Sequence, residues 1–128
     1  MSISVFKYNG FADSRKDWEQ LYKSNDELSP CCSFDFAKAI SFDWVYRIKA
    51  RIQPEVFGIS MDNKIVMIAA LTKAADGYKM LADCNGSEYN QLTYYKDLSV
   101  GDIARCISAL REYIDKTLIF SMLPNWGG

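Results

Sequence analysis

The chain contains no histidine, and its four cysteines, Cys31, Cys32, Cys84 and Cys106, form no Cys-x-x-Cys pair. Zinc sites with imidazole ligands are therefore excluded, and the cysteine spacing fits neither a four-thiolate zinc site nor a disulfide framework. A nucleophilic Cys84 would have no histidine to act as its base, so cysteine catalysis is not expected. The sequence predicts reduced thiols, no metal site and a cytoplasmic protein.

Long apolar runs and clusters of one charge are missing as well. The longest apolar run, 65–71, is far shorter than the roughly 20 residues that span a bilayer. Residues 1–8 lack the basic start and apolar stretch of a signal peptide. The chain has 15 Lys and Arg against 16 Asp and Glu, a net charge of −1. Because nucleic-acid binding needs a basic face, neither nucleic acid nor a membrane is expected as a partner.

What is present is the composition of one globular domain spanning 1–128. Hydrophobic residues make up 49% of the 128 positions and charged residues 24%, which is enough to form a core without disulfides. Aromatic residues reach 14%. They predict a bulky core, with a groove lined by rings as the alternative.

Hydrophobic periodicity predicts a strand at 3–8 and a helix at 14–24, where Ser14-x-x-Asp17 has the form of a capping box. Ser33 is expected to cap a second helix that runs to about residue 49. The apolar stripe of that helix is Phe36, Ile40, Trp44 and Ile48. We interpret this stripe as core, the alternative being the floor of a ligand groove.

An antiparallel meander is expected next. Strands at 56–60 and 64–72 are joined by Asp62-Asn63, a tight-turn pair, and a third strand occupies 78–83. Because 65–71 is apolar on both faces, we expect a central strand that is covered on both sides. Residues 85–98 show no clear period and contain three tyrosines.

Near the end of the chain, Ser99-x-x-Asp102 again has capping-box form and opens a helix to residue 116, followed by a strand at 117–122. The apolar stripe of this helix is Ile103, Cys106, Ile107, Leu110 and Ile114. The strand–helix–strand unit implies a right-handed crossover and a parallel pair. The predicted class is α/β (α+β): a mixed, mainly antiparallel sheet with helices on both faces, in the order β-α-α-β-β-β-α-β.

This order resembles the N-terminal part of the GNAT acyltransferase fold, through its fifth strand. Short sequence segments add to the resemblance: Asp17-Trp18-Glu19-Gln20-Leu21-Tyr22, Ser29-Pro30, Ser33-Phe34, the Trp44 helix and Asp62-Asn63-Lys64-Ile65-Val66. They are similar to the opening of a two-domain subgroup, the cellulose-biosynthesis-type acetyltransferases and the Fem-type aminoacyltransferases, which carry two GNAT-like halves in tandem. The similarity covers nearly all of the chain.

The chain departs from the GNAT pattern at the loop that binds coenzyme A. GNAT enzymes hold the pyrophosphate on an Arg/Gln-x-x-Gly-x-Gly/Ala loop, whose backbone N–H groups point at phosphate oxygens. The corresponding stretch here, 85–99, has only Gly86, and Gly101 lies inside the helix. In addition, the last helix and two strands of the fold and the second tandem half are absent. The resemblance therefore implies a domain without a complete coenzyme A site.

Transfer to an amine would need a base, and the resemblance makes Asp83 and Glu55 the positional candidates. Any contact with acetyl-CoA or another acyl-CoA would fall at Asn85, Gly86 and Ser99. The residues that could line a substrate mouth are Tyr89, Tyr94, Tyr95 and Trp44. For each carboxylate the simpler interpretation is a solvated surface group, and for the tyrosines it is cover for a sheet edge.

Three hypotheses follow. The first is an acyltransferase-related GNAT-like domain, an N-acyltransferase if active, standing alone or as the N-terminal half of a tandem protein. The second is a non-catalytic interaction module that forms a homodimer, or pairs with a second GNAT-like half, through the apolar tail with Leu123 and Trp126. The third is a small-ligand-binding domain. The sequence names no acyl donor, acceptor or pathway.

Overall fold

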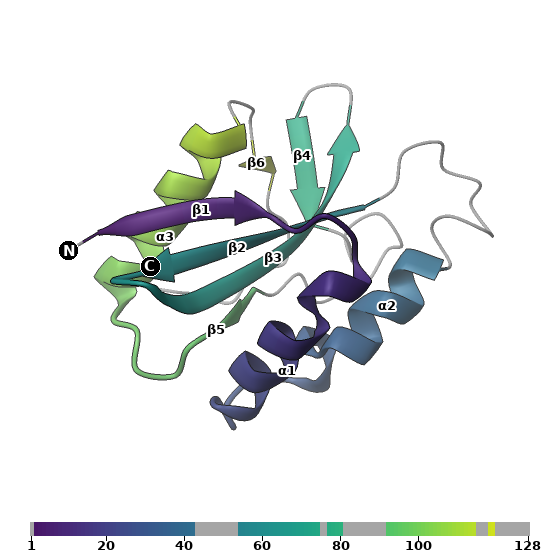
Figure 1. Ribbon diagram of the computed structural model, residues 1–128, viewed down its shortest axis with the longest axis horizontal. Coiled ribbons are helices and arrows are strands. Elements are labelled where there is room, and N and C mark those ends of the chain that lie inside the picture. The colour runs from purple at the N-terminus through teal and green to yellow at the C-terminus, as the bar shows by residue number, and fades with distance from the viewer. Residues whose placement is uncertain (1, 43–53, 75–76, 81–91, 115–117, 120–128) are drawn as a thin grey trace.

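The computed structural model describes residues 2–42, 54–74, 77–80, 92–114 and 118–119 (Figure 1). Its helices are α1 (Arg15–Lys23), α2 (Phe34–Phe42) and α3 (Val100–Ile114). Its strands are β1 (Ile3–Lys7), β2 (Glu55–Met61), β3 (Lys64–Ala74), β4 (Gly77–Met80), β5 (Thr93–Tyr94) and β6 (Leu118–Ile119). Short 3₁₀ turns at Ala12–Ser14 and Pro30–Cys32 lead into α1 and α2. No helix in these ranges is long and apolar enough to cross a membrane.

The strands form one mixed sheet in the order β1-β2-β3-β4-β6, and β5 adds to β3. All pairs are antiparallel except β4 with β6, which are parallel and connected through α3. The predicted mixed sheet, its meander and its parallel pair are therefore confirmed. The sequence analysis missed β5, a strand of two residues inside the stretch without a clear period.

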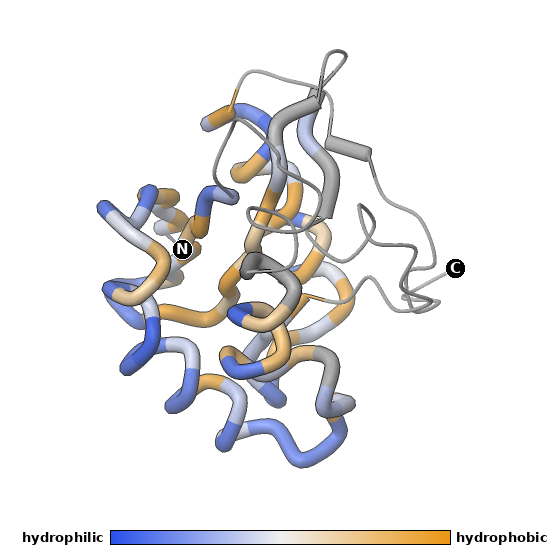
Figure 2. The backbone as a smooth tube through the Cα atoms, turned by 90° about the vertical axis from the view of Figure 1, so that its right-hand side faces the viewer, coloured by the Kyte–Doolittle hydropathy of each residue, from blue (hydrophilic) through white to orange (hydrophobic). Residues whose placement is uncertain are grey.

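β3 is the central strand of the sheet, as predicted. Its residues 66–71 are each at most 6% exposed. Met67, Ala69 and Leu71 face the core under α3, whereas Ile68 and Ala70 face the core under α1 and α2. Figure 1 shows α3 on one face of the sheet and α1 and α2 on the other. Helices therefore cover both faces, and in Figure 2 hydrophobic positions gather along the central strands.

The turn between β2 and β3 has the backbone expected for Asp62-Asn63. Both residues have positive φ angles, 52° and 67°, as a type I′ hairpin turn requires, and Asp and Asn tolerate this region better than most residues. The backbone N–H of Ser2 donates to Asp62 Oδ1 at 3.0 Å, and the N–H of Asp62 donates to the Ser2 carbonyl at 2.9 Å. The turn thus sets the register of the hairpin and holds the start of β1.

The helix caps agree with the prediction at two places out of three. Ser33 Oγ accepts from the N–H of Phe36 and Ser99 Oγ from the N–H of Asp102, each at 3.1 Å. The capping box at Ser14 was wrong. Ser14 has helical backbone angles and donates its hydroxyl to the Phe11 carbonyl at 2.7 Å, because the 3₁₀ turn before α1 already occupies this position.

The second helix is described as far as Phe42. Its buried positions include Phe34 and Ala37, whereas Phe36, the first member of the predicted stripe, is only partly buried. Phe34 is buried because its ring meets Trp18 edge-on, with centroids 5.7 Å apart. Trp44 and Ile48 lie outside the described residues, so the groove-floor alternative stays a prediction.

Candidate functional site

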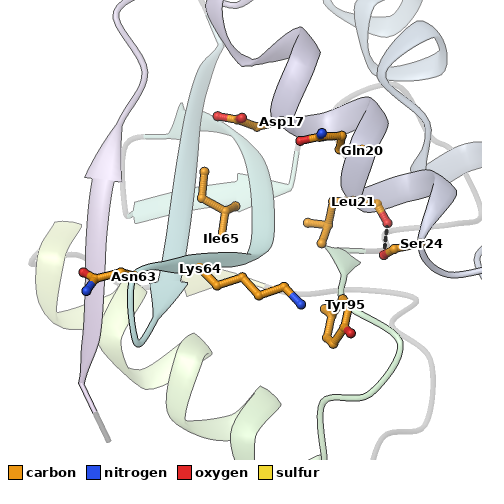
Figure 3. A pocket seen from close by; sticks show the side chains of 8 residues that line it. All are labelled: Asp17, Gln20, Leu21, Ser24, Asn63, Lys64, Ile65 and Tyr95. Carbon is orange, nitrogen blue, oxygen red and sulfur yellow. Dashed lines mark hydrogen bonds between the residues drawn. The ribbon is translucent and has the colours of Figure 1, made fainter.

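A groove of about 530 Å³ lies between α1 and the start of β3 (Figure 3). One wall is a polar stripe of α1, the floor is the first part of β3, and the far end is closed by a tyrosine that follows β5. The lining residues are Asp17, Gln20, Leu21, Ser24, Asn63, Lys64, Ile65 and Tyr95. Its size is within the range of small-molecule sites.

Helix α1 forms one wall of the groove because the helical repeat places its lining residues on one face. Asp17, Gln20 and Leu21 of α1, together with Ser24 at its C-terminal cap, occupy positions i, i+3, i+4 and i+7, which lie on one face of a helix. The buried Trp18 and Leu21 hold this helix against the sheet and set the direction of the stripe. Asp17 and Gln20 consequently point from α1 over β3 (Figure 3).

The hairpin and the segment after β5 supply the other walls. The I′ turn places Asn63 and Lys64 at the beginning of β3, where Ile65 forms part of the floor. Tyr95 is fixed by its backbone N–H, which donates to the Val66 carbonyl at 2.8 Å. In Figure 3 the Lys64 side chain reaches toward Tyr95, while Asn63 points away from the rest.

Two opposite charges face the groove. The Lys64 Nζ lies 3.5 Å from the centroid of the Tyr95 ring, a cation–π contact. Asp17 Oδ2 accepts a hydrogen bond from the Tyr8 hydroxyl at 2.8 Å. Burial, and then the hydrogen bond and charge of Asp17, raises the pKa of Tyr8. Tyr8 therefore remains a neutral donor to this carboxylate at ordinary pH.

Of the predicted site residues, Tyr95 lines this groove, but Tyr94 does not. Tyr94 packs against the core under α3, and its carbonyl accepts from Asn25 Nδ2 at 3.1 Å. Ser99 caps α3 and is exposed. The other predicted residues, Asp83, Asn85, Gly86, Tyr89 and Trp44, lie outside the described residues.

Glu55 begins β2 on the α3 side of the sheet, away from the groove. Its Oε1 forms an ion pair of 2.9 Å with Lys7 Nζ, while its Oε2 is buried with no hydrogen-bond partner among the described residues. Burial, followed by the effect of this carboxylate, raises the pKa of the nearby Tyr78. Glu55 pairs with Leu71, about 20 Å along β3 from Ile65. Glu55 and Tyr95 thus do not share a site.

The N-terminus of α3, where a GNAT enzyme would hold phosphate, carries an acidic side chain here. Asp102 lies in the first turn, and its Oδ1 forms an ion pair of 2.6 Å with Arg105 Nη1. A Cβ added at Gly101 would meet only Ser99 Oγ at 3.8 Å and Arg105 Nη2 at 4.0 Å. No protein atom therefore crowds this position, and the packing of the described residues does not require a glycine here.

Gly101→Ala is accordingly expected to stabilise the domain. The added methyl fits in open space, and alanine favours the helical conformation over glycine by about 0.5–1 kcal/mol in a helix interior, so we expect a gain of a few tenths of a kcal/mol near this end. Urea denaturation followed by circular dichroism would measure it, with Ser108→Ala on the same helix as the matched control. Loss of stability in Gly101→Ala would mean that the glycine has a conformational role.

The sequence analysis found the tyrosine of the groove but not its charged and amide side chains. A signal was available, since Asp17, Gln20 and Ser24 form a polar stripe directly beside the buried stripe of Trp18 and Leu21.

In the ranges that the structure describes, no three Cys, Asp or Glu side chains are grouped as metal ligands. No family model matches the chain, and neither a curated protein nor a solved structure matches it.

Proposed function

We propose that this chain is an acyltransferase-related domain of GNAT-like fold that lacks a complete coenzyme A site of its own. The observation that supports the relationship is the sheet: an antiparallel β1-β2-β3-β4 meander followed by α3 and by β6 parallel to β4. Apart from the added two-residue strand β5, this is the order that the resemblance implies through the fifth strand. A solved structure in which β4 and β6 are not neighbouring parallel strands would contradict the relationship.

The second half of the proposal, an incomplete coenzyme site, is supported by the start of α3. A helix N-terminus attracts phosphate when its N–H groups are free and its surroundings are not anionic. Here Ser99 Oγ already accepts a hydrogen bond from one of those N–H groups, and Asp102 adds a carboxylate to the first turn. Arg105, the nearest cation of α3, is paired with that carboxylate.

Calorimetric titration with acetyl-CoA tests this part of the proposal directly. We expect no measurable heat of binding at millimolar coenzyme, because the pyrophosphate would meet a capped and acidic helix end. Desulfo-CoA, which keeps the pyrophosphate, is the matched control. Micromolar binding of both would contradict the proposal, and Asp83, Glu55 and Asn85 would then be the first residues to replace.

The interaction-module alternative predicts a homodimer, or pairing with a second GNAT-like half, through the tail that contains Leu123 and Trp126. This tail lies outside the described residues, and sedimentation in the same buffer would test the dimer. The ligand-binding alternative is favoured by a specific observation, the groove beside α1. No ion pair among the described residues neutralises Asp17 or Lys64 in this groove, so the chemistry of a ligand can be inferred from these two charges.

A further inference from the structure

The groove carries one carboxylate and one ammonium group that no ion pair neutralises. Among the described residues no Lys or Arg nitrogen lies within 4 Å of Asp17, and no carboxylate lies within that distance of Lys64. Elsewhere among the described residues some exposed charges do form ion pairs, such as Lys96 with Asp26 at 3.0 Å and Arg15 with Glu19 at 2.7 Å. The two charges in the groove are thus available to a ligand.

These charges lie at opposite ends of the groove. Asp17 is at the first turn of α1, whereas the Lys64 Nζ lies against Tyr95, near the end of the helix at Ser24 (Figure 3). Asp17 and Ser24 are seven helical positions apart, which corresponds to about 10 Å along the helix axis. An occupant that satisfies both charges must therefore be elongated, with a cation and an anion about 10 Å apart.

The surface between the charges is mixed in character. Leu21 in the wall and Ile65 in the floor provide apolar surface. Gln20 offers an amide that both donates and accepts hydrogen bonds. Ser24 Oγ donates to the Leu21 carbonyl at 2.6 Å and keeps its lone pairs for a donor on the ligand. This combination fits a chain with small apolar side groups and amide bonds, not a purely hydrocarbon one.

We propose that the groove binds an elongated zwitterion of the kind represented by a short unblocked peptide. Its amino group meets Asp17, its carboxylate meets Lys64, and its amide groups meet Gln20 and Ser24. Three extended residues span about 10 Å, so a tripeptide matches the separation of the charges. This site is distinct from the coenzyme region at the start of α3, so it stands or falls independently of the acyltransferase-related assignment.

The test is calorimetric titration of the full chain with the tripeptide Gly-Leu-Gly, its N-acetyl derivative and its C-terminal amide. We expect weak binding of the free tripeptide, and weaker binding by about fivefold for each blocked form, as for the loss of one partly exposed ion pair. NMR chemical-shift changes should centre on Gln20, Ile65 and Tyr95. No binding at millimolar tripeptide, or shifts centred on Glu55 and Tyr78, would overturn the proposal.

Two variants identify which end of the peptide each charge contacts. Asp17→Asn should weaken the binding of the free tripeptide and leave the affinity for the N-acetyl form unchanged. Lys64→Met should weaken the binding of the free tripeptide and leave the affinity for the C-terminal amide unchanged. Glu112→Gln and Lys38→Met, at exposed positions away from the groove, are the matched controls, and circular dichroism verifies that each variant folds. Equal losses for blocked and free peptides in either groove variant would contradict the assigned orientation.

Discussion

Replacing Trp18 by alanine is expected to lower the free energy of unfolding by about 3–5 kcal/mol, the range for truncating a buried aromatic residue. Trp18 is 4% exposed and packs between Phe11 and Phe34, with ring centroids 5.9 and 5.7 Å away. Its indole Nε1 donates to the Cys32 carbonyl at 2.9 Å and to Thr93 Oγ1 at 3.1 Å. One side chain therefore joins α1, the turn before α2 and β5.

Trp18→Phe separates the ring packing from the hydrogen bonds. It keeps an aromatic ring in place but removes the donor, so we expect about 1–3 kcal/mol of destabilisation, clearly less than for alanine. The Cys32 carbonyl would still accept from Thr93 Oγ1, which lies 2.5 Å away. Urea denaturation monitored by circular dichroism measures both variants, because Trp44 and Trp126 complicate fluorescence. A loss below about 1 kcal/mol in Trp18→Ala would contradict the role of Trp18 as a junction of three segments.

The second large effect is a loss of stability at alkaline pH that depends on Cys106. This thiol is fully buried beneath α3. Burial, with a smaller contribution from the charge of Asp102, raises its pKa from 9.0 to about 11. Between these values the unfolded chain loses the thiol proton while the native chain keeps it. Stability must therefore fall as pH rises from 9 toward 11, by about 2–3 kcal/mol from this group.

Cys106→Ala is the variant that isolates this contribution. At pH 8 it should be less stable than the parent chain, because the methyl group leaves part of the thiol's volume empty. As the pH approaches 11 the difference should close, since the variant has no thiol to ionise. Denaturation curves at several pH values between 8 and 11 provide the test. A constant difference across this range would show that Cys106 is not protected from ionisation, and Cys32→Ala serves as the comparison at another buried thiol.

The elements with dense local signals could be predicted from the sequence. The run from Val66 to Leu71 is short, apolar at every position and preceded by a turn signal, which favours a strand covered on both faces. Asp62-Asn63 predicts a tight turn, whose conformation is decided within four residues. The apolar stripe of Ile103, Cys106 and Leu110 lies within one helix. In each case the structure is decided by interactions between residues close in the chain, so the sequence pattern alone predicts it.

Most of the features that escaped prediction depend on contacts between distant segments. Ser14 is the local exception: it has the sequence of a cap, but it ends a 3₁₀ turn and donates its hydroxyl to the Phe11 carbonyl. β5 exists because Thr93 and Tyr94 pair with Ile68 and Met67. The groove needs Asp17, Lys64 and Tyr95, which are separated by more than thirty positions each and come together only when α1 and β5 pack against β3.

The hydrogen bonds between Ser2 and Asp62 have a practical meaning for work on this protein. They hold the start of β1 at the turn before β3, one residue from Asn63 and two from Lys64. Ser2 therefore lies beside the turn that supplies Asn63 and Lys64 to the groove. A fluorophore attached at Ser2 would therefore report on a ligand that binds at Lys64.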